Sequence, residues 1–159
     1  MGVAEVSNVL WREREQLELL LFKLEEEQLL LAAGRTRWLP HATREVELVL
    51  EQLRASELLR AVEVDDYAES VGLPAGPGLS ELAEASGEPW RELLLAHRTA
   101  LLELTTEISA ISRANGEVLV AAQRTAHEAL LSLGGSVETY APTGRAAAPT
   151  RSHLFDRAL

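Results

Sequence analysis

Apolar residues recur along the first thirty positions with alternating steps of three and four, which predicts one long amphipathic helix. We expect this helix over about residues 3–33, with Ser7 as the N-cap near its start. Glu13 and Glu27 occupy two positions of the apolar stripe, so charged residues interrupt it. The apolar members of the stripe are Val3, Val6, Leu10, Leu17, Leu20, Leu24 and Leu31.

A second helix is expected over about residues 40–71. Gly34 fits a left-handed C-cap and Pro40 fits the first turn of a following helix, so a tight turn joins two antiparallel neighbours. Gly72 and Pro74 end the second helix. Its predicted buried residues are Thr43, Val46, Leu50, Leu53, Ala61, Val64 and Ala68, and its predicted water-facing residues are Glu45, Glu47, Glu51, Arg54 and Arg60.

The third long helix is expected over about residues 88–133. Its heptad seam contains Trp90, Leu94, His97, Leu101, Leu104, Ile108, Ile111 and Asn115. Asn115-Gly116 is a common stop signal, but the apolar stripe resumes at once with Leu119, Ala122, Ala126, Ala129, Leu130 and Leu133. We therefore expect a continuous or kinked helix.

Two segments differ from these helices in composition. The string GLPAGPG between Gly72 and Gly78 predicts a loop, with a short helix over residues 80–85 within the connection. Residues 136–159 contain too few large apolar side chains to offset the entropy of ordering, which predicts a disordered tail. The fold class is all-α: an elongated antiparallel bundle of three long helices over residues 1–135, with room for a short extra helix.

Composition narrows the class of partner. The formal charge of −10 and the pI near 4.9 disfavour nucleic acid and anionic lipid surfaces. The longest apolar runs are too short for membrane insertion, and the first ten residues lack the features of a signal peptide. We expect a cytoplasmic protein.

The sequence offers little reactive chemistry. No histidine has a glutamate three residues before it, and His127 begins HEALL rather than a zinc-protease motif. We therefore expect no enzymatic activity, no metal and no cofactor. His97 on the seam is favoured as a structural histidine over a ligand or pH switch. The turn at residues 35–38 mixes arginines with Trp38, which either contacts a partner or, as we favour, folds back onto the bundle end.

Three long amphipathic helices with 4% aromatic residues make a thin bundle. Such a bundle tends to leave an apolar groove that accepts an amphipathic helix from a partner or from a second copy. The chain's own short helix filling this place, or self-association into a homodimer, is the alternative.

The C-terminal part resembles a known family. Asn115-Gly116-Glu117-Val118-Leu119, the helix to Leu133, and the YAPTGR string from Tyr140 to Arg145 are similar to the end of FlgN flagellar export chaperones. The resemblance implies a type III secretion chaperone that binds the C-terminal segments of the hook-filament junction proteins FlgK and FlgL. It also implies that such a chaperone prevents their premature assembly and delivers them to the export gate protein FlhA.

Two sets of residues are predicted to carry this role. Small alanines on the last helix allow close helix approach, so we expect client binding by Ile108, Ile111, Asn115, Val118, Leu119, Ala122, Ala126 and Leu130. The resemblance implies export-gate docking by Tyr140 and Gly144. The alternative function is a generic coiled-coil dimerisation or adaptor module without a secreted client.

Overall fold

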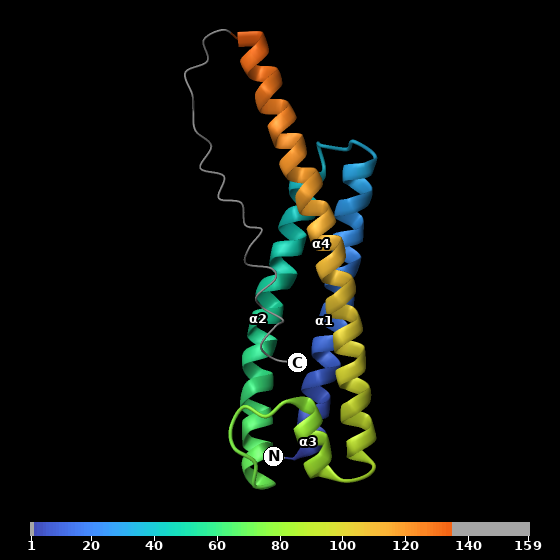
Figure 1. Ribbon diagram of the computed structural model, residues 1–159, viewed down its shortest axis with the longest axis vertical. Helices are drawn as coiled ribbons and strands as arrows, with labels where there is room; N and C mark the ends of the chain where they lie inside the picture. Colours follow the sequence, from blue (N-terminus) through green and yellow to red (C-terminus); the bar gives the residue numbers. More distant parts are fainter. Residues whose placement is uncertain (1, 135–159) are drawn as a thin grey trace.

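The computed structural model describes residues 2–134 and shows an elongated, all-helical bundle (Figure 1). The helices are α1 (Val3–Ala32), α2 (Leu39–Ser70), α3 (Leu79–Ser86) and α4 (Trp90–Gly134). The three long helices run antiparallel to their sequence neighbours, and the short helix α3 lies at one end (Figure 1). The predicted fold class is confirmed, and the predicted ends of the long helices differ from the observed ones by at most two residues.

The helix α1 is the centre of the bundle because it packs against both α2 and α4. Its stripe of Leu10, Leu17, Leu20 and Leu24 is fully buried. The core residues that face it include Val46, Leu53 and Val64 on α2 and Leu94, Leu101 and Ile108 on α4. Burial of such branched side chains stabilises the fold by about 1.5–3 kcal/mol each.

The start of α1 differs from the prediction. Gly2 is the N-cap, and its backbone N–H donates to the carboxylate of Glu5 at 2.9 Å. Ser7 lies inside the helix and is buried, with its hydroxyl 3.2 Å from Nε2 of His97. The prediction of Ser7 as the N-cap is therefore wrong, because its hydroxyl contacts another helix instead of the backbone.

The buried face of α2 also differs from the prediction, at two neighbouring positions. Arg60, predicted to face water, is buried, and Ala61, predicted to be buried, is exposed. The guanidinium Nη1 of Arg60 lies 3.1 Å from Oε1 of Glu13 on α1. Burial raises the pKa of the Glu13 carboxyl and the charge of Arg60 opposes this. The pairing allows Arg60 to lie on the buried face of α2 between Leu53 and Val64, since an unpaired buried carboxylate at Glu13 would be costly.

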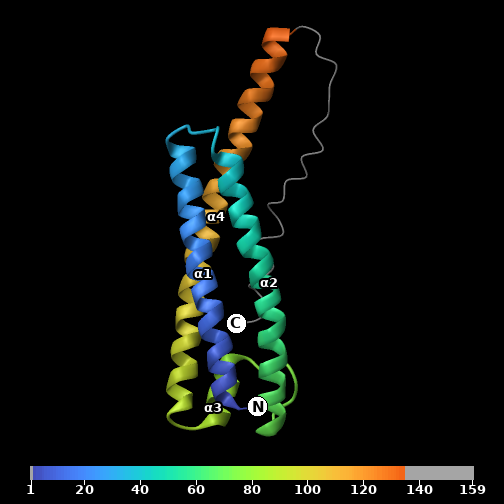
Figure 2. The same ribbon diagram turned by 180° about the vertical axis from the view of Figure 1, so that it is seen from behind.

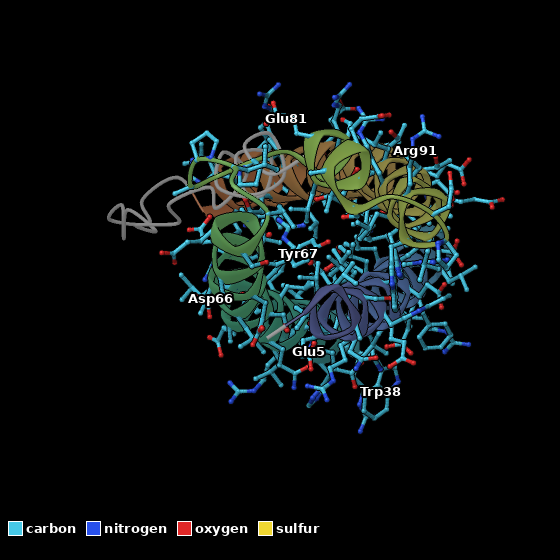
Figure 3. All side chains as sticks on the ribbon, turned by 90° about the horizontal axis from the view of Figure 1, so that it is seen from below. Glu5, Trp38, Asp66, Tyr67, Glu81 and Arg91 are labelled. Atoms are coloured by element: carbon cyan, nitrogen blue, oxygen red, sulfur yellow. The ribbon has the colours of Figure 1, made fainter. Side chains whose placement is uncertain are left out.

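The short helix α3 closes one end of the bundle, where it packs against α4. Leu82 and Ala83 are fully buried, and the hydroxyl of Tyr67 on α2 donates to Oγ of Ser86 at 2.9 Å. Figure 3 shows this end, with Tyr67 pointing into the space between the helices and Arg91 pointing outward. The fourth place of the bundle is thus filled by the chain itself at this end.

Candidate functional site

The last part of α4 projects beyond the tip of the α1–α2 hairpin (Figures 1 and 2). From Glu117 to Leu133 every residue except Leu119 is exposed, and Leu119 is half-buried. We call residues 117–134 the arm. Its large apolar side chains are unusually accessible, with Leu130 62% and Leu133 86% exposed. Contiguous exposed apolar side chains commonly mark an interaction surface.

One face of the arm continues the stripe that packs against α1 lower down. Helical spacing places most of the arm's apolar residues in line with the buried positions Ile108 and Asn115, whereas Val120 and Leu131 lie on the opposite side of the helix. We call this set the arm stripe: Val118, Leu119, Ala122, Ala126, Ala129, Leu130 and Leu133. Glu117, Arg124 and Glu128 lie on the opposite face. The hairpin ends too early to cover the arm stripe beyond Leu119.

A buried polar layer holds the base of the arm to the hairpin. The side-chain amide of Asn115 donates to the backbone oxygen of Leu24 at 2.9 Å and to Oε1 of Glu27 at 3.1 Å. The hydroxyl of Thr43 on α2 donates to Oε2 of Glu27 at 2.9 Å. This layer connects all three long helices, and both Glu27 and Asn115 are almost completely buried.

The residues predicted to bind a client fall into two groups. Ile108 and Asn115 are 3% and 1% exposed, and Ile111 is half-buried against the core. These three hold α4 in the bundle. Val118, Leu119, Ala122, Ala126 and Leu130 all lie on the arm stripe. Ala129 and Leu133 share that stripe and were missed as site residues, although their spacing of three and four residues indicated the same face.

A groove joins the base of the arm to the hairpin tip, which we define as residues 33–44. Gly34 in the tip has φ 65°, and Pro40 lies in the first turn of α2, as predicted. The groove is lined by Thr36, Leu39, Pro40, His41, Thr43, Arg44 and Glu47 of the hairpin and by Leu119 of the arm. Trp38 is 48% exposed and points away from the bundle (Figure 3), so the prediction that this side chain folds back onto the bundle end is wrong.

His97 belongs to the packing of the bundle and not to the arm. It is fully buried, and the ring of Trp11 packs against it edge-on at 4.8 Å. Arg14 can only donate, so Nδ1 of His97, 3.4 Å away, accepts, and Nε2 carries the proton toward Ser7. Burial, and secondarily the charge of Arg14, lowers the pKa of His97 to about 4. The neutral, buried ring fits the structural role predicted for it.

Other kinds of site are not seen in the part of the chain that the structure describes. Among residues 2–134, no three histidine or acidic side chains gather closely enough to hold a metal ion. The described helices also include none with the length and hydrophobicity that a bilayer span requires. Tyr140 and Gly144, predicted to dock at an export gate, lie outside the described residues.

A match to a protein family comes from the comparisons with known proteins. The family model described as FlgN protein matches residues 1–148, which is nearly the whole chain and includes the arm. A search of curated proteins found no match to the chain, and a search of solved structures found none either.

Proposed function

Because the chain belongs to the FlgN family of flagellar export chaperones, we propose that its clients are the C-terminal helical segments of the hook-filament junction proteins FlgK and FlgL. The chaperone masks these segments in the cytoplasm, prevents their premature assembly and delivers them to the export gate. Masking is a binding function and requires no catalytic group.

The arm stripe is the observation that supports this proposal most directly. It continues the core-facing seam of α4 into a region where the hairpin no longer covers it. An amphipathic helix from a client completes the packing there as α1 does lower down, with its apolar side chains against Leu119, Ala122 and Ala126. Small residues at the centre of the stripe let the two backbones approach closely.

The predicted site residues take different parts in this proposal. Val118, Leu119, Ala122, Ala126 and Leu130 contact the client, together with Ala129 and Leu133. Ile108, Ile111 and Asn115 position the arm. Residues 1–135 form the client-binding domain, and residues 136–159 form a tail in which Tyr140 and Gly144 dock at the export gate protein FlhA.

Isothermal titration with the C-terminal segments of FlgK and FlgL from the same genome tests the proposal. We expect saturable binding of about one client per chain, in the micromolar range or tighter. Leu119→Asp and Leu130→Asp should weaken binding by about a hundredfold or more, since each places a carboxylate against an apolar surface. Leu58→Asp is the matched control, because Leu58 is an exposed leucine on α2.

A second outcome would favour the alternative function, a dimerisation or adaptor module without a secreted client. The outer face of α2 exposes Leu48, Leu58, Leu59 and Val62, which is a surface on which a second copy can pack. No binding heat with either segment, combined with a dimer in light scattering that Leu58→Asp disrupts, would replace the client-binding proposal with self-association.

A further inference from the structure

The hairpin tip carries a local charge opposite to that of the whole chain. Residues 33–44 contain Arg35, Arg37 and Arg44 and no acidic residue, in a chain with a formal charge of −10. All three arginines are exposed. Client masking as described above does not involve residues 33–44. The packing of these residues in the bundle does not require three arginines.

These arginines have no carboxylate partner among residues 2–134. The ion pairs of that region involve Lys23, Arg60 and Arg91. Of the acidic side chains nearby, Glu45 pairs with Lys23 at 3.0 Å, and Glu27 accepts from Thr43 and Asn115. Arg37 lies over the ring of Trp38 at 4.8 Å, a contact that holds the guanidinium without neutralising its net charge. The tip is therefore able to receive an external negative group.

The tip and the arm stripe form one continuous surface. Leu119 belongs to the arm stripe and also lines the groove, while Thr36, His41 and Arg44 line the groove from the tip. Glu47 is the acidic member of the lining and lies one turn further along α2 than Arg44. A helix that lies on the arm stripe therefore has one of its ends directed at the groove and the tip.

We propose that the client helix lies antiparallel to α4, so that the hairpin tip receives its C-terminal end and α-carboxylate. This inference rests on the proposed function and adds the direction of the client. The last turn of a helix carries unsatisfied carbonyl groups and a partial negative charge, which nearby cations stabilise. The α-carboxylate of a chain that ends there adds a full charge within reach of Arg35 and Arg44.

The opposite direction brings like charges together. A client helix parallel to α4 would place its N-terminal N–H groups, with their partial positive charge, at the three arginines. Its carboxylate would then lie at the far end of the arm, where the described helix has no lysine or arginine beyond Arg124. Charge complementarity therefore selects the antiparallel direction.

The first experiment compares two forms of the same client peptide, one with a free C-terminal carboxylate and one with a C-terminal amide. We expect the amide to bind the full-length chain about fivefold more weakly at low salt. In the double variant Arg35→Gln/Arg44→Gln the two peptides should bind equally. Arg12→Gln/Arg54→Gln is the matched control, because both arginines are exposed and lie away from the tip, and it should keep the fivefold difference.

The second experiment measures direction itself. The chain contains no cysteine, so Thr36→Cys and Ser132→Cys each allow one nitroxide label, at the tip and near the end of the arm. The label at position 36 should broaden the amide signals of the C-terminal residues of an isotope-labelled client peptide, and the label at position 132 those of its N-terminal residues.

The outcomes separate the two proposals. The reversed broadening pattern, or a fivefold difference that survives in Arg35→Gln/Arg44→Gln, would overturn the antiparallel direction and leave the client-binding function standing. Absence of binding by either peptide form would overturn the client-binding function and this inference with it.

Discussion

At the scale of single residues, polar side chains within the apolar seams determine how the helices pair. Glu13, Glu27, His97 and Asn115 all occupy seam positions, and each has a partner on another helix. Buried polar groups without partners would cost about 1–3 kcal/mol each. An arrangement with α4 moved by one turn would leave several of them unpaired, so these residues favour one register of the bundle.

Because of His97, the stability of the bundle in this register depends on pH. Its pKa is about 4 in the folded chain and 6.5 in an unfolded one, so the unfolded state binds more protons between these values. Its contribution to stability is therefore complete above pH 6.5 and is lost as the pH falls toward 4. We expect acidification over this window to cost about 1–3 kcal/mol through His97.

Urea unfolding at pH 7 and pH 4.5, for the natural chain and for His97→Gln, measures this contribution. Burial raises the pKa of Glu13 and Glu57, which acts in the opposite direction. Those groups are common to both proteins, so the difference between the proteins isolates His97. The stability advantage of the natural chain should shrink by about 1–3 kcal/mol at the lower pH, and an unchanged advantage would contradict the prediction.

At the scale of elements, α4 continues through a dipeptide that usually ends a helix. Asn115 is held by its hydrogen bonds to Leu24 and Glu27, which stabilise the helical conformation at this point. Gly116 follows within the helix and its position is open, because a Cβ added there would meet nothing within 4 Å. Tertiary contacts thus override the local preference of the Asn-Gly pair.

Gly116→Ala should stabilise the chain by about 0.5–1 kcal/mol, since alanine loses less backbone entropy in a helix interior. Thermal unfolding followed by circular dichroism measures the effect. Gly34→Ala is the contrasting variant: a Cβ there also meets nothing within 4 Å, but φ is 65°. That variant should lose about 1 kcal/mol through backbone strain. Destabilisation by both would show that Gly116 has another role.

At the scale of the whole molecule, the burial of side chains changes sharply along α4. From Leu94 to Asn115 the helix α4 is held by the core, whereas the arm beyond it has almost no buried side chains among the described residues. An isolated helical segment of this size is marginal in water. The arm therefore gains most from a partner that covers its stripe.

Hydrogen exchange measures this difference along one helix. Amides of residues 118–132 should exchange at least about a hundredfold faster than those of residues 97–112 in the free protein. A saturating client segment should slow exchange in the arm and leave the lower part of α4 nearly unchanged. Uniform protection along α4 without a client would contradict the assignment of the arm as a separately stable segment.

Much of this architecture follows from periodicity. The three long helices, the hairpin turn at Gly34 and the seam of α4 could be predicted because apolar spacing and glycine and proline positions act locally. The burial of Arg60 could not be predicted, because it depends on pairing with Glu13, which is distant in sequence. The sequence also could not show that Ile108 is buried in the bundle while Leu130 is exposed on the arm. Both residues belong to one continuous apolar stripe, and what separates them is the place where the hairpin ends.

The polar layer at Asn115 has one more consequence, which concerns length. By fixing α4 against Glu27 and Thr43, it fixes where the exposed helix begins relative to the hairpin; the described stretch from Glu117 to Gly134 is roughly 27 Å long at 1.5 Å per residue. A client whose amphipathic segment is about five turns long covers this stretch, and a shorter segment leaves part of its apolar surface exposed.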